Sequence, residues 1–178
     1  DARKGVPATL RALARVPAEA RLGLRVVLAG RLDADCRARV AELTAGLRDT
    51  DRDSQSLCVV DRFLTTAELD WLVARSDVVL APYHRHVGSS GALIWAARHG
   101  KPVLAQDYGL IGALVRDYRL GLTVDTTDPA AIAVAMQRLV DPATRAALTQ
   151  SARWADFLAG RAADDFAQQL YAAVGEAM

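Results

Sequence analysis

Basic and small polar residues follow directly after an apolar segment in the middle of the chain. Residues 77–83, DVVLAPY, lead into His84, Arg85 and His86, and then into the turn GSSG at 88–91. Imidazole and guanidinium groups donate hydrogen bonds, and a helix that begins at such a turn presents N–H groups without intrahelical partners. Aligned peptide dipoles add partial positive charge at that end. The pattern predicts a site for a phosphate or pyrophosphate group.

The same turn also has a purely structural interpretation. Ser89 or Ser90 could cap the helix and Gly88 could form a tight turn, with no ligand involved. The position of the turn favours a site, because it follows a continuously apolar, β-branched run that is typical of a strand buried on both faces. Ligands of open α/β sheets bind at the carboxyl edge of the strands. We therefore expect Gly88, Ser89, Ser90 and Gly91 to line a site at that edge.

The elements that must position this site alternate along residues 1–125. Strands are expected at Arg25–Ala29, Leu57–Val60, Asp77–Ala81, Pro102–Ala105 and Leu122–Asp125. Helices are expected at Pro7–Val16, Asp33–Leu47, Thr66–Ser76, Ser90–His99 and Leu110–Tyr118. This alternation predicts an α/β fold, a Rossmann-like doubly wound parallel sheet with helices on both faces.

Residues 126–178 carry helical patterns only and form the predicted C-terminal tail. Asp128-Pro129 and Asp141-Pro142 each place a side-chain acceptor before a proline at the first helical position, which marks two helix starts. A third helix is expected after Gly160. The length of 178 residues suits one domain, so residues 1–178 are predicted to form a single domain.

Composition excludes several kinds of partner. The net charge is +1 with 24% charged residues, and no basic stripe indicates nucleic-acid binding. No apolar run approaches the roughly 18 residues of a membrane span. Cys36 and Cys58 show neither metal-ligand spacing nor a pairing pattern, which predicts reduced thiols in the cytoplasm. His84 and His86 have no nearby carboxylate or thiolate to complete a metal site, so no metal is expected.

Other enzyme classes lack their motifs. No GxGxxG follows a strand, as a dinucleotide-binding oxidoreductase would require, and no GxxxxGK[ST] indicates an ATPase. Neither serine of the GSSG turn lies in the nucleophile elbow of a hydrolase.

Six segments together resemble a known family over nearly the whole chain. They are RKGV at 3–6, RVVLAG at 25–30, RFLTTAEL at 62–69, SDVVLAPY at 76–83, GSSG at 88–91 and HGKPVLA at 99–105. In this order they resemble the C-terminal domain of GT-B glycosyltransferases of the group called glycosyl transferases group 1. The resemblance implies a nucleotide-diphospho-sugar donor, no cofactor or metal, and an unknown acceptor held largely by an N-terminal domain that this chain lacks.

The resemblance also assigns roles to individual residues. Lys4 matches the family lysine that neutralises the leaving diphosphate, where a preorganised cation lowers the barrier. The partner arginine of the family lies on a preceding strand, before Asp1. Gly109 and Gly112 match a turn that approaches the donor sugar, or else serve local turn geometry. The loop at Arg62–Thr66 matches the position that holds the nucleobase.

One departure from the family pattern leaves two functions open. The family has two glutamates eight positions apart that contact the donor sugar and the ribose, and this chain has Val87 and Trp95 there. Trp95 would stack on a sugar or ribose face, or belong to the core. The chain is then part of a glycosyltransferase, inactive by itself, or a noncatalytic module that binds a nucleotide sugar or a protein. The retained RKG, GSSG and HRH segments favour the enzyme.

The absent family strand predicts a break in the sheet. That strand would be central, flanked by the strands that begin at Arg25 and Asp77, so these two are expected not to pair directly. An open central edge leaves backbone groups unpaired, which is costly. A further segment or a neighbouring chain, through self-association, is expected to fill the gap.

Overall fold

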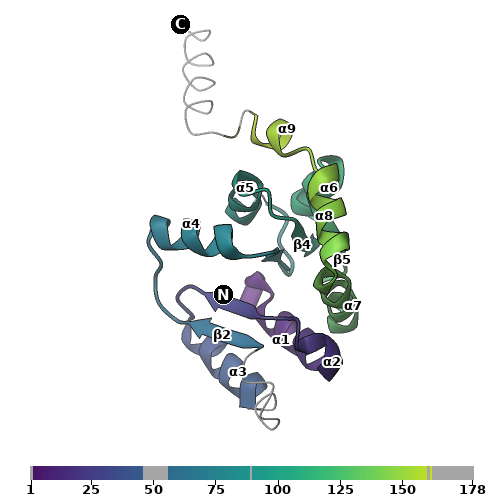
Figure 1. Cartoon of the computed structure of the whole chain (residues 1–178). Helices are drawn as coiled ribbons and strands as arrows, with labels where there is room; N and C mark the ends of the chain where they lie inside the picture. Colours follow the sequence, from purple (N-terminus) through teal and green to yellow (C-terminus); the bar gives the residue numbers. More distant parts are fainter. Residues whose placement is uncertain (1, 46–55, 89, 160, 162–178) are drawn as a thin grey trace, which may run out of the picture.

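The computed structural model describes residues 2–45, 56–88, 90–159 and 161, and within them a parallel α/β fold (Figure 1). The strands are Val26–Ala29 (β1), Leu57–Val60 (β2), Val79–Ala81 (β3), Val103–Gln106 (β4) and Gly121–Val124 (β5). Each coincides with an expected strand to within two residues at either end, which confirms the predicted fold class.

Helices connect the strands and continue after β5. They are Ala2–Lys4 (η1, a 3-10 turn), Val6–Arg15 (α1), Ala18–Arg21 (α2), Ala34–Ala45 (α3), Thr66–Arg75 (α4), Gly91–Arg98 (α5), Gly109–Asp117 (α6), Pro129–Val140 (α7), Pro142–Ser151 (α8) and Trp154–Leu158 (α9). Both predicted proline starts are confirmed, because Asp128 accepts the Ala130 N–H and Asp141 those of Ala143 and Thr144.

Two short α-helices, like the 3-10 turn η1, were not predicted. α2 has four residues and buries none of them. α9 has five residues, too few to show a helical period, and is held by Phe157, which is fully buried edge-on against Tyr118. The helix expected after Gly160 lies outside the described residues.

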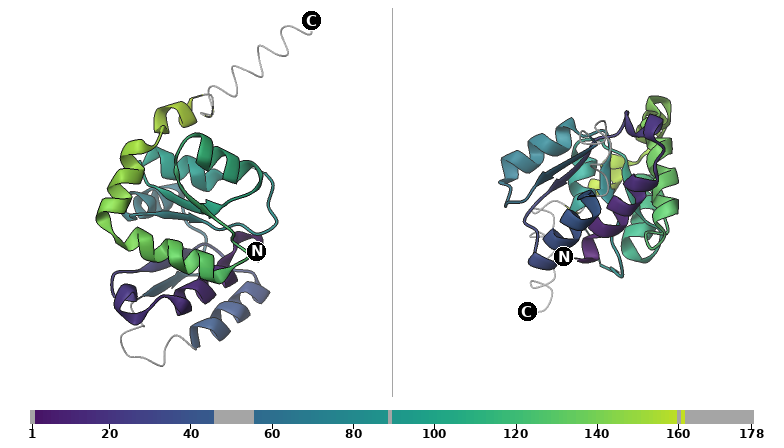
Figure 2. Two further views of the ribbon diagram at one scale, coloured as in Figure 1. Left: turned by 90° about the vertical axis from the view of Figure 1, so that its right-hand side faces the viewer. Right: turned by 90° about the horizontal axis from the view of Figure 1, so that it is seen from below.

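The strands form two separate sheets, as the absent family strand predicts. β1 pairs with β2, and β3, β4 and β5 pair in that order, all parallel. Within the described ranges no ladder joins β1 to β3. The two sheets nevertheless share one core: Val26 of β1 and Leu104 of β4 pack with Leu13 of α1 and Met136 of α7. α1 lies between α3 and α7 on this face (Figure 2).

β4 shows how both faces of the larger sheet are covered. All four of its residues are buried, and alternate side chains point to opposite faces of a strand. Leu104 belongs to the core on the α1 and α7 face. Val103 and Ala105 belong to a second core, built with α5, α6 and α9. The continuous apolar run in the sequence therefore reflects burial on both sides.

The first described residues lie at the carboxyl end of β3, beside the gap between the sheets. Arg3 O accepts the His84 N–H at 2.8 Å. Gly5 has φ +71°, and a Cβ there would lie 1.8 Å from Pro82 O, so only glycine fits this close approach. A right-handed crossover through α1 would place a preceding parallel strand next to β1, in this gap.

We expect an extended segment that precedes residue 2 to pair with β1 and β3. In a longer protein that supplies it, amide hydrogen exchange should slow at those N–H groups of Val26–Ala29 and Val79–Ala81 that face the gap, because each gains a backbone acceptor. Mass spectrometry over a concentration series would show whether a second copy fills the gap instead. Equal exchange in the longer and the shorter chain, at all concentrations, would refute a filled gap.

Candidate functional site

Three side chains meet at the carboxyl end of β3, where a pyrophosphate site was predicted. Lys4 Nζ donates to Tyr83 Oη at 3.3 Å, and Tyr83 Oη lies 2.6 Å from Ser90 Oγ. The Lys4 ammonium also lies 5.0 Å from the centroid of the Tyr83 ring. Ser90 is the N-cap of α5 and accepts the Ala92 N–H. A lysine from the start of the chain is thus held beside the N-terminus of α5.

Tyr83 is the residue in this group that sequence reasoning missed. It closes the apolar run 77–83 and was not among the predicted site residues. Its ring is buried, yet its hydroxyl links the two predicted residues Lys4 and Ser90. A buried tyrosine hydroxyl needs a polar partner, so a tyrosine at the carboxyl end of a strand is a usable sequence signal.

Only some of the predicted site residues in the turn after Tyr83 lie close together. The His86 ring stacks on Tyr83 with centroids 5.0 Å apart, and a Cβ on Gly88 would lie 3.5 Å from that ring. Gly91 begins α5, and a Cβ there would meet none of the described residues within 4 Å. Ser89 lies outside the described residues. His86, Gly88, Ser90 and Gly91 therefore adjoin one another.

The other members of the predicted HRH group point elsewhere. Arg85 is exposed and has φ +52°, an unusual conformation for a non-glycine residue, with its N–H donating to Tyr108 Oη at 2.5 Å. His84 lines a different cavity, with Gly5 and Thr126. The three basic residues do not converge, because the left-handed conformation at Arg85 turns the backbone between His84 and His86.

Buried polar side chains donate hydrogen bonds to carbonyl groups of this turn. Gln106, fully buried at the end of β4, donates from Nε2 to His86 O at 2.6 Å and to Tyr108 O at 2.9 Å. Thr126, also fully buried, donates to Tyr83 O at 2.7 Å. Gly109 has φ +63°, and a Cβ there would lie 3.2 Å from His86 O, so this predicted ligand residue backs the turn. Gln106 and Thr126 were not predicted as site residues, although the sequence shows a glutamine at the end of an apolar strand.

Trp95 lies one turn after Gly91 on the same face of α5. It is half-buried, and the Arg98 guanidinium lies 5.8 Å from its ring centroid. It is not a member of either large core cluster, where its neighbours Leu93 and Ala96 are found. Val87, at the other position where the resemblance places a glutamate, is 75% exposed. Neither position offers a carboxylate.

A separate cavity of about 520 Å³ lies at the carboxyl ends of β1 and β2. It is lined by Arg31, Leu32, Asp33, Ala34, Arg37 and Phe63. Phe63, from the predicted nucleobase loop, is 74% exposed, with the Arg31 guanidinium 5.4 Å from its centroid. An exposed aromatic ring beside an arginine is suited to stack on a flat heterocycle.

Ion pairs fix the loops around this cavity. Arg37 donates to Asp61 at 2.6 Å and, with the Leu32 N–H, lowers the pKa of that carboxyl. Arg62 donates to both carboxylate oxygens of Glu68, which also caps α4 with Thr65, and these hydrogen bonds lower the pKa of Glu68 to about 2. The 62–66 loop is therefore positioned by charged hydrogen bonds before any ligand arrives.

Within the described parts of the chain, no group of three or more His, Cys, Asp or Glu side chains is placed to hold a metal ion. Over the same residues, no helix combines the length and apolarity needed to cross a membrane. Cys36 and Cys58 are both free thiols.

Comparisons with known proteins agree with this architecture. The structure is similar to that of HepE from Anabaena in complex with UDP, with a TM-score of 0.79 and 18% identity, over 99% of this chain and 46% of that one. Sucrose-phosphate synthase from Thermosynechococcus elongatus gives 0.70 and 24%, over 97% and 44%. The chain thus spans less than half the length of these GT-B proteins, which fits one domain of two. No curated protein sequence matches it.

The family itself is shown by the sequence. The family described as glycosyl transferases group 1 matches residues 1–142, most of the chain. This match covers all five strands and the Lys4, Tyr83 and Ser90 positions. The chain therefore belongs to the glycosyl transferases group 1 family.

Proposed function

We propose that the chain is the donor-binding domain of a glycosyltransferase that moves a sugar from a nucleotide-diphospho-sugar to an acceptor. The observation that carries this proposal is the hydrogen-bonded series Lys4, Tyr83 and Ser90 at the N-terminus of α5. It joins a cation and two hydroxyls to the positive end of a helix dipole at one point, which is the chemistry that a diphosphate requires. Support also comes from HepE, which shares the fold and was solved with UDP-glucose.

The two halves of a nucleotide have candidate positions on either side of the gap between the sheets. The cavity beside Phe63 lies over β1 and β2, and Lys4 and Ser90 lie beside β3. With the expected strand in the gap, the strand order reverses between that strand and β3, and ligands of open α/β sheets bind at such a reversal. We propose that the nucleobase stacks at Phe63 and that the diphosphate reaches across to Lys4.

The chemical role of Lys4 follows from the charge that develops in the reaction. As the glycosidic bond breaks, the departing diphosphate gains negative charge, and an ammonium held in place stabilises that charge without reorganising. Tyr83 is a positioning residue here, because its hydroxyl fixes both Lys4 Nζ and Ser90 Oγ. None of the described residues lies within 4 Å of a Cβ at Gly91, so phosphate oxygens can approach the backbone at the start of α5.

A noncatalytic binding module is the competing function. The exposed Val87 and the half-buried Trp95 favour it, because a site without carboxylates has fewer groups to orient a sugar. The intact series from Lys4 to Ser90 favours the enzyme, because a structural remnant has no need of a lysine beside a helix start. The free thiols of Cys36 and Cys58 suit a cytoplasmic protein of either kind.

Lys4→Met should weaken UDP binding by about 1.5–3 kcal/mol, the scale of a lost hydrogen bond to a charged group. The dissociation constant measured by calorimetry should rise roughly 10- to 100-fold. Lys101→Met is the matched control, because Lys101 precedes β4 and lies at the opposite edge of the sheet. Equal affinities for the two variants would remove Lys4 from the site.

Tyr83→Phe should keep the ring packed but release both Lys4 and Ser90. Loss of a neutral hydrogen bond costs about 0.5–1.5 kcal/mol, so UDP affinity should fall roughly two- to tenfold. Tyr118→Phe removes a hydroxyl from a tyrosine that packs against Phe157 and serves as control. An unchanged affinity for Tyr83→Phe, with thermal stability like that of the control, would show that the linkage does not preorganise the site.

Donor turnover should separate the two candidate functions. A calorimetric screen of UDP-, GDP- and ADP-sugars would first identify the donor class, and release of nucleoside diphosphate by the longer protein would then be measured. An enzyme should release it, and Lys4→Met should slow that release. Tight binding of a nucleotide sugar with no release in the presence of any of a panel of acceptors would favour the noncatalytic module.

A further inference from the structure

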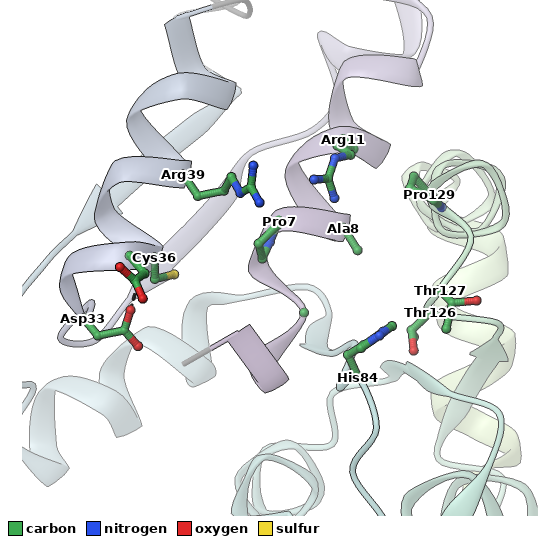
Figure 3. A pocket seen from close by; sticks show the side chains of 12 residues that line it. Pro7, Ala8, Arg11, Asp33, Cys36, Arg39, His84, Thr126, Thr127 and Pro129 are labelled. Carbon is green, nitrogen blue, oxygen red and sulfur yellow. Dashed lines mark hydrogen bonds between the residues drawn. The ribbon is translucent and has the colours of Figure 1, made fainter.

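A second cavity, of about 430 Å³, lies at the carboxyl edge on the side of α1 (Figure 3). Its walls come from the first turns of α1, α3 and α7 and from the turn after β3. The charged side chains that line it are Arg11, Asp33, Asp35 and Arg39, and His84 and Thr127 add further polar groups. This volume is in the range of small-molecule sites. None of the side chains of Lys4, Tyr83 or Ser90 lines it.

Two arginines from different helices converge on this cavity. Arg11 of α1 and Arg39 of α3 extend their guanidinium groups toward each other over the first turns of α1 (Figure 3). Arg11 is half-buried, and its guanidinium makes no hydrogen bond or ion pair with the described residues. Arg39 is exposed, and among the described residues its side chain has only a contact with Glu42, at 3.6 Å.

Two guanidinium groups beside one cavity can hold the same anion. An oxyanion that lies between Arg11 and Arg39 accepts charge-assisted hydrogen bonds from both forks. A phosphate group matches this geometry because it offers several acceptor oxygens to two guanidinium groups at once.

The remaining walls favour a hydroxylated ligand body over a bare ion. The Asp35 carboxylate, in the first turn of α3, accepts hydrogen bonds from hydroxyls, and it would repel a second phosphate. His84, half-buried, projects into the cavity from the opposite end, where it lies beside Thr126 and Thr127 (Figure 3). The imidazole can donate or accept, as a polyol hydroxyl requires.

We propose that this cavity binds a small phosphorylated polyol, such as a sugar phosphate, with its phosphate between Arg11 and Arg39. The polyol body then lies toward Asp35 and His84. This site is distinct from the donor site, although the two are neighbours along the chain: Gly5 lines the cavity directly after Lys4, and His84 lines it directly after Tyr83.

The test is a calorimetric titration with three probes, namely inorganic phosphate, glycerol 3-phosphate and fructose 6-phosphate. The protein should bind fructose 6-phosphate at least tenfold more tightly than inorganic phosphate. Arg11→Ala and Arg39→Ala should each weaken that binding at least tenfold. Arg15→Ala is the matched control, because Arg15 lies one turn further along α1, is exposed, and should leave binding unchanged.

The same variants separate this proposal from the donor site. Lys4→Met should leave fructose 6-phosphate binding intact, and Arg11→Ala should leave UDP binding intact. Loss of fructose 6-phosphate binding in Lys4→Met would place that ligand in the donor site and overturn the second site. Equal affinities for Arg11→Ala, Arg39→Ala and Arg15→Ala, in variants with matching thermal unfolding, would also overturn it. Inorganic phosphate binding as tightly as fructose 6-phosphate would overturn the polyol part.

Discussion

The close approach of the chain's first turn to the end of β3 is the constraint on which the site depends. The His84 N–H donates to Arg3 O, and Gly5 lies so near Pro82 O that no side chain fits between them. These backbone contacts flank Lys4 on both sides, so its ammonium is directed to the Tyr83 hydroxyl. A flexible lysine would lose more rotamer entropy on binding a diphosphate than one already held in this way.

A second constraint comes from buried side chains that donate hydrogen bonds to the turn that follows Tyr83. Gln106 and Thr126 are fully buried, and each donates to a carbonyl of this turn, at His86 and at Tyr83. A movement of the turn would break both contacts and leave two buried donors without acceptors, at a cost of about 1–3 kcal/mol each. The left-handed conformation of Arg85 persists because these contacts and Tyr108 fix the backbone around it. The position of His86 beside Tyr83 is thus determined by residues far away in sequence.

The fold could be predicted from the sequence because its signals are local. β4 is apolar at every position but its last, and Asp128 and Asp141 stand before prolines at helix starts, so periodicity and capping locate these elements. α9 was not predicted, because five residues are too few to show a helical period of apolar residues. The split between β1 and β3 was also predictable, but only from the resemblance and its absent strand. The residues of a strand do not by themselves indicate which other strand pairs with it.

The site was predicted less completely, for a physical reason. The composition of the Gly88–Gly91 turn predicts a helix start, and the resemblance identified Lys4. The link between them is Tyr83. Its role depends on a contact with Lys4, 79 residues away in the sequence. The consecutive basic residues at 84–86 suggested one cluster. The backbone instead sends His84 to one side of the turn and His86 to the other.

The carboxyl edge of the domain therefore has two sides that share one backbone segment. A single turn of backbone presents His86 to the donor side and His84 to the cavity beside α1, and the segment 3–5 does the same with Lys4 and Gly5. Both sides therefore share a backbone that is held by the same contacts from Gln106 and Thr126. Because these contacts already fix the backbone, a ligand on either side meets a preorganised surface and does not have to order the turn itself.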